Sequence, residues 1–544
     1  MPSRPLAADA ERVRALSRDV AMSGRLARDL PAYLRHEFTL AETQAHVREQ
    51  LARRQQRLLA VVDRTIYDRP DSPYWQLLKH AGCERGDFSK LVRAEGVEGA
   101  LRVLATQGVY VTFDEFKGRR VAVRGSARFT FTDRDFDNPC VPWHYFEMTG
   151  GTRGRSIRVG RTLPYVTENV DFMGPVYAAH DVWNPHLVFW FGSSPTSALM
   201  HLKLGHTLDG WFHPVRPLPL VARAGIQYVR MLARIAGRRI PNPRYLDLQA
   251  PEQMVHRIVA LRRDGRTVLV NSAVNSAVRV AARATAMGVS LEGVVFHARS
   301  EPLTEARQQT IERSGARTIG DYASVELSVL GYSCARRTAS DDVHFGTHRY
   351  AVIERTRPIF QDGPQIDSLH FTTLSPNHTK IALNVEMGDA GRIEERACGC
   401  PLGDLGLTTH ISALRSFEKL STEGTTFARG NLLRILEEIL PARFGGSAVD
   451  YQLVEEEGPD GTARLVMRID PAVGPVDEPA VRAAFLDGLT SGGIVETYQA
   501  RLLDRARVLV VQRRRPIATG AGKVLPFHLN RPVRGTTTSP TPAS

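Results

Sequence analysis

The chain has 544 residues, of which 42% are hydrophobic and 24% are charged. One hydrophobic core stops growing at roughly 250–300 residues, so this length excludes a single core and predicts at least two domains. Five cysteines argue against a disulfide-rich secreted scaffold. No apolar run approaches the ~20 residues of a spanning helix, and the N-terminus lacks the apolar core of a signal peptide. We therefore expect a cytoplasmic protein without a membrane span.

The net charge is +13, because 71 basic residues exceed 58 acidic ones. The basic residues are mostly arginines scattered along the chain, and the densest run is Arg513-Arg514-Arg515. A solvated, arginine-rich surface is the favoured interpretation. A pocket for an anionic ligand such as a nucleotide comes second, and nucleic acid third. We predict no nucleic-acid partner.

The N-terminal part is predicted to be helical over residues 8–62, with a buried stripe of Leu40, Val47, Leu51, Leu58 and Leu59. A short helix over 72–82 ends at Gly82, and the next helix stops at Gly108 before a strand.

Residues 146–159, FEMTGGTRGRSIRV, combine three glycines, two threonines and three arginines. Glycine lets backbone N–H groups approach an anion closely, so the loop can wrap a polyphosphate. It lacks the G-x-x-x-x-G-K-[ST] spacing of the P-loop, and by itself it leaves a plain turn open.

Strands and helices alternate from residue 267 to residue 326, starting with a strand at 267–271, a polar turn and a helix. This alternation predicts an α/β protein with parallel strands and crossover helices. Ligands bind beyond the carboxyl ends of such strands. The polar residues at these ends are Asn271, Ser272, Ser300, Glu301, Tyr322 and Glu326.

The pattern changes beyond residue 415 to an amphipathic helix, two strands around a Pro-Asp-Gly turn, a second helix and a strand. We predict a large mixed α/β domain over 1–415 and a small α+β domain over 416–534. The Thr/Pro/Ser-rich segment 535–544 is predicted to be disordered.

Four further motifs follow the glycine-rich loop in order: DYASVE (321–326), Gly388-Asp389, LRSFEKLSTEG (414–424) and ATGAGKVLPFHLNR (518–531). In this order they resemble the adenylate-forming enzymes over roughly residues 40–530, and most of all the phenylacetate–CoA ligase branch, which includes acyl-protein synthetases. TGGTRG is similar to that family's phosphate loop, YASVE to its Tyr-x-x-x-Glu segment, and ARSEPLTEAR (298–307) to its GGE-x-L segment. MGD (387–389) is similar to its Thr-Gly-Asp, RSFEKLSTEG to its hinge, and AGK (521–523) to its C-terminal lysine loop.

The resemblance implies a role for each of these positions. The implied ATP-binding residues are Thr149, Gly150, Gly151, Thr152, Gly154, Ser300, Glu301, Tyr322, Asp389 and Arg415. The implied catalytic residues are Thr152, Glu326 and Lys523, with Glu326 as a ligand of Mg²⁺ and Lys523 between the carboxylate and the α-phosphate. The implied hinge of a mobile C-terminal domain lies at Phe417 and Glu418.

Some positions depart from the family pattern. Arg155 and Ser156 stand where a lysine and a proline are usual, and Ala323 stands where a glycine is usual. Phe417 and Glu418 replace the usual hinge aspartates. An arginine keeps the positive charge near the loop, but with a different fork geometry.

Cys398-Gly399-Cys400 is a C-x-C pair that suits a tetrahedral Zn²⁺, which needs four ligands. Cys334 and His344 are the candidates for the other two, and the resemblance implies a similar Cys…His…Cys-x-Cys set for structural zinc. Buried free cysteines are the alternative. Cys83 and Cys140 have no partner by spacing.

The function hypothesis is ATP-dependent activation of a carboxylic acid to an acyl-adenylate with pyrophosphate release, followed by transfer to coenzyme A. The acceptor in the first alternative is an amine, a carrier protein or a protein cysteine. The second alternative is a non-catalytic nucleotide-binding protein. The predicted acid pocket consists of Phe189, Trp190, Asn271, Ser272 and Val274, which weakly favour an apolar or aromatic acid. A homodimer is left open.

Overall fold

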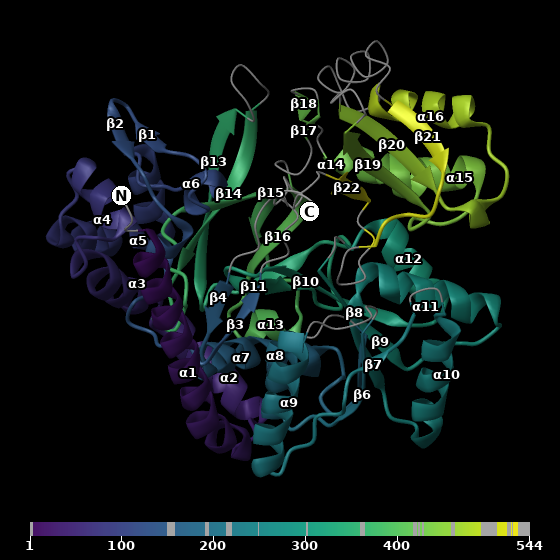
Figure 1. The fold of residues 1–544 in the computed structure, drawn as a ribbon, viewed down its shortest axis with the longest axis horizontal. Coiled ribbons are helices and arrows are strands. Elements are labelled where there is room, and N and C mark those ends of the chain that lie inside the picture. Colours follow the sequence, from purple (N-terminus) through teal and green to yellow (C-terminus); the bar gives the residue numbers. More distant parts are fainter. Residues whose placement is uncertain are drawn as a thin grey trace, which may run out of the picture. The chain divides into compact units, whose positions relative to one another are not determined.

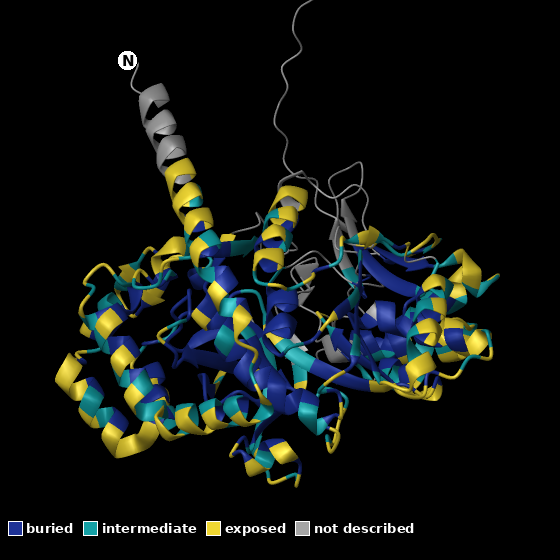
Figure 2. Cartoon of the chain, turned by 90° about the horizontal axis from the view of Figure 1, so that it is seen from below, coloured by how far each residue is buried: buried dark blue, intermediate teal, exposed yellow. Residues whose placement is uncertain are grey.

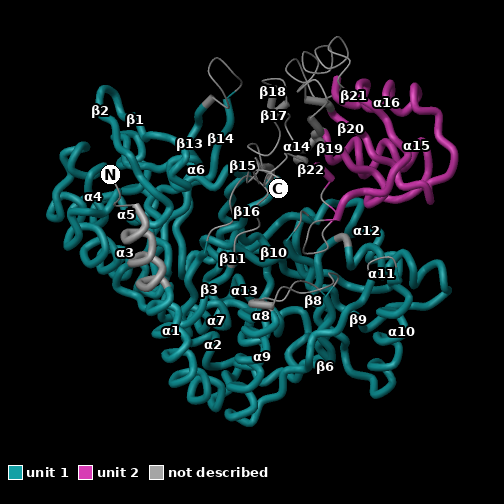
Figure 3. Tube along the Cα trace, in the orientation of Figure 1, with its two compact units in different colours: residues 1–414 teal, residues 415–544 magenta. Residues whose placement is uncertain are grey.

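The structure is a computed structural model that describes residues 4–148, 158–190, 195–213, 220–247, 250–300, 303–358, 365–416, 421–422, 425–426, 429–457, 463–490, 509–518, 524 and 526–530. The chain divides into two compact units, residues 1–414 and 415–544 (Figure 3).

The first unit begins with a series of helices: α1 (Arg4–Arg35), α2 (Leu40–Ala52), α3 (Arg54–Val62), η1 (Asp63–Tyr67), α4 (Pro73–His80), α5 (Arg85–Thr106) and α6 (Phe113–Phe116). Local capping sets their starts. At α2, the Thr39 side chain accepts from the Glu42 amide while Glu42 accepts from the Thr39 amide. Residues 16–18 of α1 are exposed, and burial along this helix begins around Met22 and Leu26 (Figure 2).

One half of the large sheet of unit 1 is parallel, in the order β10-β9-β8-β5-β6-β7. Its strands are β5 (His186–Trp190), β6 (Leu208–His213), β7 (Arg244–Tyr245), β8 (Val268–Ala273), β9 (Val294–Arg299) and β10 (Arg317–Ser324). The connecting helices are α8 (Pro195–Lys203), α9 (Leu220–Ile235), α10 (Glu252–Leu261), η3 (Arg262–Asp264), α11 (Val274–Ala286) and α12 (Glu305–Arg313). The predicted α/β class with parallel strands and crossover helices is confirmed.

The junction of β8 and α11 differs from the sequence prediction. The polar turn expected after residue 271 is wrong, because β8 continues through Asn271 and Ser272 to Ala273, and α11 begins at Val274. The strand persists because every residue of β8 is buried between neighbouring strands, so Asn271 and Ser272 keep ladder partners on both sides.

The other half of the sheet continues from β10 in the order β10-β11-β12-β16-β15-β14-β13 (Figure 1). These strands are β11 (Ser328–Tyr332), β12 (Val343–Phe345), β13 (Tyr350–Pro358), β14 (Gln365–Thr373), β15 (Val385–Glu395) and β16 (Thr409–Ser416), with α13 (Pro401–Asp404) before β16. The pairs β10–β11, β11–β12, β12–β16, β13–β14 and β14–β15 are antiparallel.

Two hairpins and a long buried helix accompany the sheet: β1 (Ala122–Arg124) with β2 (Ala127–Phe129), β3 (Tyr145–Met148) with β4 (Arg158–Arg161), and α7 (Leu163–Ala179). The 3-10 turn η2 (Asp133–Phe136) lies between the hairpins. Pro164 occupies the first turn of α7, and the Thr162 hydroxyl accepts from the Tyr165 amide. These two features fix where α7 begins.

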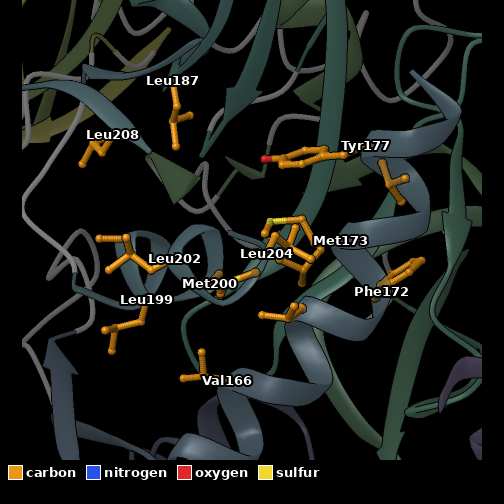
Figure 4. Close-up of a cluster of buried hydrophobic side chains, with 14 of the residues drawn as sticks. Val166, Phe172, Met173, Tyr177, Leu187, Leu199, Met200, Leu202, Leu204 and Leu208 are labelled. Carbon is orange, nitrogen blue, oxygen red and sulfur yellow. The ribbon is translucent and has the colours of Figure 1, made fainter. Parts of the chain in front are cut away.

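The core of unit 1 contains two large apolar clusters. In the first, Val166, Met173 and Tyr177 of α7 pack with Leu199, Met200 and Leu202 of α8 (Figure 4). The second joins the N-terminal helices to β13, β14 and β15. Burial of such side chains contributes roughly 1.5–3 kcal/mol for each one.

The second unit contains a four-stranded sheet in the order β21-β20-β19-β22. Its elements are β17 (Ser421–Thr422), β18 (Thr425–Thr426), α14 (Arg429–Arg434), η4 (Ile435–Ile439), α15 (Leu440–Phe444), β19 (Tyr451–Glu457), β20 (Ala463–Ile469), η5 (Pro471–Val473), α16 (Glu478–Thr490), β21 (Leu509–Arg513) and β22 (Phe527–Asn530). Leu436, Phe485 and Met467 belong to its separate apolar core. These helices and strands give the second unit an α+β composition.

Among the helices that the structure describes, none combines the length and the apolar character that crossing a bilayer requires.

Glycine is required at position 160 of β4, because the Trp143 indole occupies the space that a side chain would need there. An added Cβ would lie 2.1–2.3 Å from the indole of Trp143, and the Gly160 carbonyl accepts from the Thr379 hydroxyl at 2.8 Å. Gly160→Ala is therefore expected to lower the free energy of unfolding by about 1–3 kcal/mol, because the indole or the strand must move. Urea unfolding measures this change.

Gly24→Ala is the matched control, because Gly24 is exposed on α1 with no heavy atom within 4 Å of an added Cβ. That variant should be unchanged or more stable by up to about 1 kcal/mol. Equal midpoints for Gly160→Ala and the unmodified protein would contradict the close packing at β4.

Candidate functional site

The predicted phosphate loop joins the two strands of the β3–β4 hairpin. Met148 ends β3 and Arg158 begins β4, and the two residues pair across the hairpin. The loop residues Thr149, Gly150, Gly151, Thr152 and Gly154 lie outside the described residues, as do Arg153, Arg155 and Ser156. The base of the hairpin is described and fixes where the loop starts and ends.

Arg161 attaches this hairpin base to the segment that carries Glu326. Arg161 is 2% exposed, and its guanidinium donates to Glu147 Oε2 at 2.8 Å and to the Val325 carbonyl at 2.6 Å. Glu147 also accepts from the Thr196 hydroxyl at 2.6 Å. Burial alone would lower the pKa of Arg161, but nearby tyrosines and the Glu147 carboxylate more than offset that effect. The guanidinium therefore stays charged.

Glu326 forms a buried ion pair with Lys117, which follows α6. Burial lowers the pKa of the Lys117 ammonium, although the Glu326 carboxylate opposes this shift. One carboxylate fits a Mg²⁺ ion, which keeps several waters and binds substrate phosphates. Lys117 was not predicted, because a lone lysine after a four-residue helix carries no recognisable motif.

Tyr322 and Asp389 meet although they come from strands four positions apart in the sheet order. Neighbouring strands lie about 4.8 Å apart, so a flat sheet would separate β10 from β15 by about 19 Å. The Tyr322 hydroxyl instead donates to Asp389 Oδ2 at 2.9 Å. The antiparallel half of the sheet therefore curls back on itself.

Local backbone features permit this approach. The β10–β11 register shifts between Tyr322 and Ala323, and Gly388 has a φ of +77° immediately before Asp389. Burial, followed by the Asp389 charge, raises the pKa of Tyr322 well above its ordinary value, so the phenol keeps its proton and donates.

The remaining predicted ATP-binding residues are not all described. Ser300 follows the last residue of β9, with an exposed side chain and a φ of +69°. Glu301, Phe417, Glu418 and Lys523 lie outside the described residues, as does the side chain of Arg415.

The predicted acid-pocket residues are buried and adjacent, but they point to two faces of the sheet. Phe189 pairs with Asn271, and Trp190 pairs with Ser272, across β5 and β8. Successive residues of a strand point to opposite faces, so one pair faces each side. Val274 opens α11.

A buried histidine–tyrosine network lies on the Asn271 side and was missed by the sequence interpretation. His201 Nδ1 lies 3.0 Å from His206 Nδ1, and His206 Nε2 lies 2.8 Å from the Trp183 carbonyl. Burial lowers the pKa of both imidazoles, that of His206 to about 4. Neutral His206 must donate from Nε2 to the Trp183 carbonyl, so its Nδ1 accepts a hydrogen bond from Nδ1 of His201. Nε2 of His201 is therefore an acceptor.

The network continues through Tyr177 to the start of the Tyr322 segment. Tyr177 Oη lies 2.8 Å from His297 Nδ1, and His297 Nε2 faces Asp321 Oδ2 at 3.4 Å. Arg299 donates to the same Asp321 oxygen at 2.7 Å. The network thus fixes the carboxylate beside Tyr322. These residues lie on separate strands and helices, and only the fold reveals their proximity.

Cys334, His344, Cys398 and Cys400 form one cluster, with ligand atoms within 4.8 Å of one another. The Sγ atoms of Cys334 and Cys398 lie 4.0 Å apart, and His344 Nε2 lies 3.4 Å and 3.2 Å from the Sγ atoms of Cys398 and Cys400. Ideal tetrahedral Zn²⁺ distances give S–S edges of about 3.8 Å and S–N edges of about 3.5 Å. The four residues therefore fit a Zn²⁺ ion.

The tautomer of His344 also suits a metal. Its Nδ1 lies 2.7 Å from the Leu407 carbonyl, to which it must donate, so Nε2 presents a lone pair to the cysteines. The cluster connects the segment after β11, strand β12 and the segment after β15.

No family model and no curated protein matches this chain. Solved structures do match. A 2-hydroxyisobutyryl-CoA ligase in complex with 2-HIB-AMP and CoA has 13% identity and a TM-score of 0.41, covering 91% of this chain and 92% of its own. The amide bond synthetase McbA from Marinactinospora thermotolerans has 14% identity and a TM-score of 0.38, covering 89% and 98%. ATP-bound MatB from Rhodopseudomonas palustris has 13% identity and a TM-score of 0.39, covering 73% and 69%.

Asp321 provides a pH-dependent test of the buried network. Burial would raise the pKa of its carboxyl, but Arg299 and His297 outweigh that effect and lower the pKa to about 2. A depressed folded-state pKa stabilises the protein above about pH 4, and this stabilisation disappears as the pH falls toward 2. The stability difference between the unmodified protein and Asp321→Asn should therefore shrink by about 2 kcal/mol over that range.

Urea unfolding between pH 6 and pH 2 measures this difference. Asp367→Asn, at an exposed carboxylate on β14, serves as the control and should show a small difference at every pH. A difference for Asp321→Asn that stays constant with pH would show that Asp321 is not held as a charged partner of Arg299.

Proposed function

We propose that this protein activates a carboxylic acid with ATP, forming an acyl-adenylate and releasing pyrophosphate. The observation that carries the proposal is the 2.9 Å hydrogen bond between Tyr322 and Asp389, formed across a curled sheet beside the segment that holds Glu326. The family resemblance implies that these two residues bind one nucleotide, and the hydrogen bond brings them into contact.

Tyr322 and Asp389 would bind the nucleoside. Both side chains are only half-buried, so each presents a surface to a ligand. The Tyr322 ring, packed 6.0 Å from Phe371, would lie along the adenine. The Asp389 carboxylate would accept hydrogen bonds from the ribose hydroxyls.

The β3–β4 hairpin would bring its glycine-rich loop to the phosphates. Arg161 holds the base of this hairpin against Val325, and thus next to Glu326. Lys117 balances the Glu326 charge and would leave it when the nucleotide arrives. Mg²⁺ bound at Glu326 would offset the negative charge of the phosphates.

The reaction exchanges one bond at the α-phosphorus. An oxygen of the substrate carboxylate attacks this atom, the bond to the β-phosphate oxygen breaks, and pyrophosphate leaves with its electron pair. Negative charge builds on the α-phosphoryl oxygens, and Lys523 would stabilise it there. Thr152 and the neighbouring glycine amides would hold the β- and γ-phosphates.

The finer assignment is a phenylacetate–CoA ligase-like enzyme that passes the acyl group to coenzyme A. In this proposal the C-terminal unit is the mobile domain, with a hinge at Phe417 and Glu418, and it carries Lys523. The motif order in the sequence supports this branch. An amine, carrier-protein or protein-cysteine acceptor is the alternative.

The cysteine–histidine cluster is proposed to hold a structural Zn²⁺. The metal would join the ends of β11 and β15 to β12. β11 pairs with the Tyr322 strand, and β15 carries Asp389, so the metal would stabilise the curl that brings these two residues together.

Pyrophosphate release with a panel of carboxylic acids, with and without coenzyme A, tests the proposed function. Acid-dependent pyrophosphate together with an acyl-CoA product supports the ligase. Acid-dependent pyrophosphate without a thioester favours another acceptor. A panel that gives no pyrophosphate contradicts the enzyme and leaves the non-catalytic alternative.

Asp389→Asn should weaken ATP binding by about tenfold or more, because a charged acceptor of hydrogen bonds is replaced by a neutral one. Asp367→Asn removes an exposed carboxylate from the neighbouring strand β14 and should bind ATP as the unmodified protein does. Calorimetric titration with ATP measures both. Equal affinities for the two variants would place the nucleotide elsewhere.

The Cys398→Ser/Cys400→Ser variant should lose about one zinc per chain and unfold at a lower temperature, because structural zinc stabilises the fold that binds it. Cys83→Ser/Cys140→Ser is the matched control, since neither cysteine belongs to the cluster. Elemental analysis and thermal unfolding provide the two readouts. A metal content that is the same in both variants would exclude this cluster as the zinc site.

A further inference from the structure

A second, separate cleft lies within unit 1, with a volume of about 850 Å³. The end of α5 and the following turn form one wall, the β1–β2 hairpin forms another, and strand β13 forms the third. A cleft of this volume can hold a nucleotide-sized ligand.

The lining of this cleft is basic. Its charged residues are Arg102, Arg124, Arg355 and one acid, Glu354. The Glu354 carboxylate already accepts from the Ile393 amide at 3.1 Å. The cleft therefore favours an anionic ligand.

Arg124 is a structural member of the lining. It is 7% exposed, donates from both terminal nitrogens to Glu115 at 3.0 Å, and donates from Nε to the Gly108 carbonyl at 2.8 Å. Its guanidinium carbon also lies 3.9 Å from the centre of the Tyr110 ring. Arg124 thus fixes Tyr110 and has little left to offer a ligand.

Arg355 is positioned by Tyr110 without a salt bridge to the described residues. Its guanidinium carbon lies 3.9 Å from the same Tyr110 ring centre, and Arg355 forms no side-chain hydrogen bond or ion pair with any residue that the structure describes. Stacking uses the flat face of a guanidinium and leaves the N–H groups at its edge available. The buried Glu386 is paired with Arg357 instead.

Arg102 supplies a second available guanidinium. Its side chain is exposed on α5, and it too has no hydrogen-bond or ion-pair partner within the described part of the chain. Tyr110 and Ser126 add hydroxyl groups to the same lining. Two arginine guanidiniums and two hydroxyls in one lining provide the donors that phosphate oxygens accept.

This cleft and the Tyr322–Asp389 pair lie on opposite faces of β14. The Tyr110 ring lies 6.0 Å from that of His370, and the Tyr322 ring lies 6.0 Å from that of Phe371. His370 and Phe371 are consecutive strand residues, so their side chains point to opposite sides. The cleft is therefore distinct from the proposed nucleotide site.

We propose that this cleft binds the phosphate group of a small organic phosphate through Arg102 and Arg355, with Tyr110 as the positioning residue that holds Arg355. The phosphate has two candidate sources, a nucleoside monophosphate or the 3′-phosphate of coenzyme A. The proposal stands on the cleft alone and does not require the proposed reaction.

Calorimetric titration of the full chain tests the proposal with AMP, adenosine, coenzyme A and dephospho-coenzyme A. The titrations use the Tyr322→Phe/Asp389→Asn background, which weakens the proposed nucleotide site while conserving side-chain shape. Arg102→Ala and Arg355→Ala should each reduce binding of the phosphate-bearing probe by about tenfold or more. Arg128→Ala, at an exposed arginine on β2 outside the lining, is the matched control and should bind normally.

Two substitutions of Tyr110 distinguish the loss of Arg355 positioning from general damage to the structure. Tyr110→Phe keeps the aromatic face and should retain affinity through Arg355, whereas Tyr110→Leu should lose about as much affinity as Arg355→Ala. Thermal unfolding of every variant identifies any that fail to fold.

The four probes distinguish the two candidate sources of the phosphate group. AMP binding that depends on the two arginines, with no binding of adenosine, supports a nucleoside phosphate. Tighter binding of coenzyme A than of dephospho-coenzyme A supports the 3′-phosphate. The proposal is overturned if no probe binds, if adenosine binds as well as AMP, or if the two arginine variants behave like Arg128→Ala.

Discussion

The hydrogen bond between Tyr322 and Asp389 is the constraint on which the candidate site depends. It joins β10 to β15, which a flat sheet would hold about 19 Å apart. A bulge at Tyr322 and a left-handed glycine at Gly388 let the two strands approach. The curl of the sheet, rather than any single motif, therefore brings β10 and β15 together to form one surface.

Two further connections keep that surface in place. Arg161 ties the base of the β3–β4 hairpin to Val325, and the network from His206 to Arg299 fixes the Asp321 carboxylate beside Tyr322. Each buried charge in these connections has an opposite charge or hydrogen-bond acceptors, which lowers the cost of burying it. Positioning of Tyr322 is thus supported from both sides.

Periodicity and turn residues were enough to predict the α/β class, the parallel half of the sheet and the α+β elements of the second unit. Residue order and ligand type also anticipated the Cys334, His344, Cys398 and Cys400 cluster, which the fold brings together. The sequence could not predict the curl, because strand order in a mixed sheet depends on long-range pairing. For the same reason it did not reveal Lys117 or the buried histidines, and it placed Ser272 in a turn when full burial keeps this residue in β8.

Hydrogen–deuterium exchange with and without ATP and Mg²⁺ measures the location of the nucleotide most directly. We expect ATP to slow amide exchange in the β10–β11 turn around residues 322–328 and in β15 around residues 387–390, since the nucleoside would bind between these segments. Slower exchange elsewhere, with both of these segments unchanged, would contradict the assignment of Tyr322 and Asp389 to the nucleotide site.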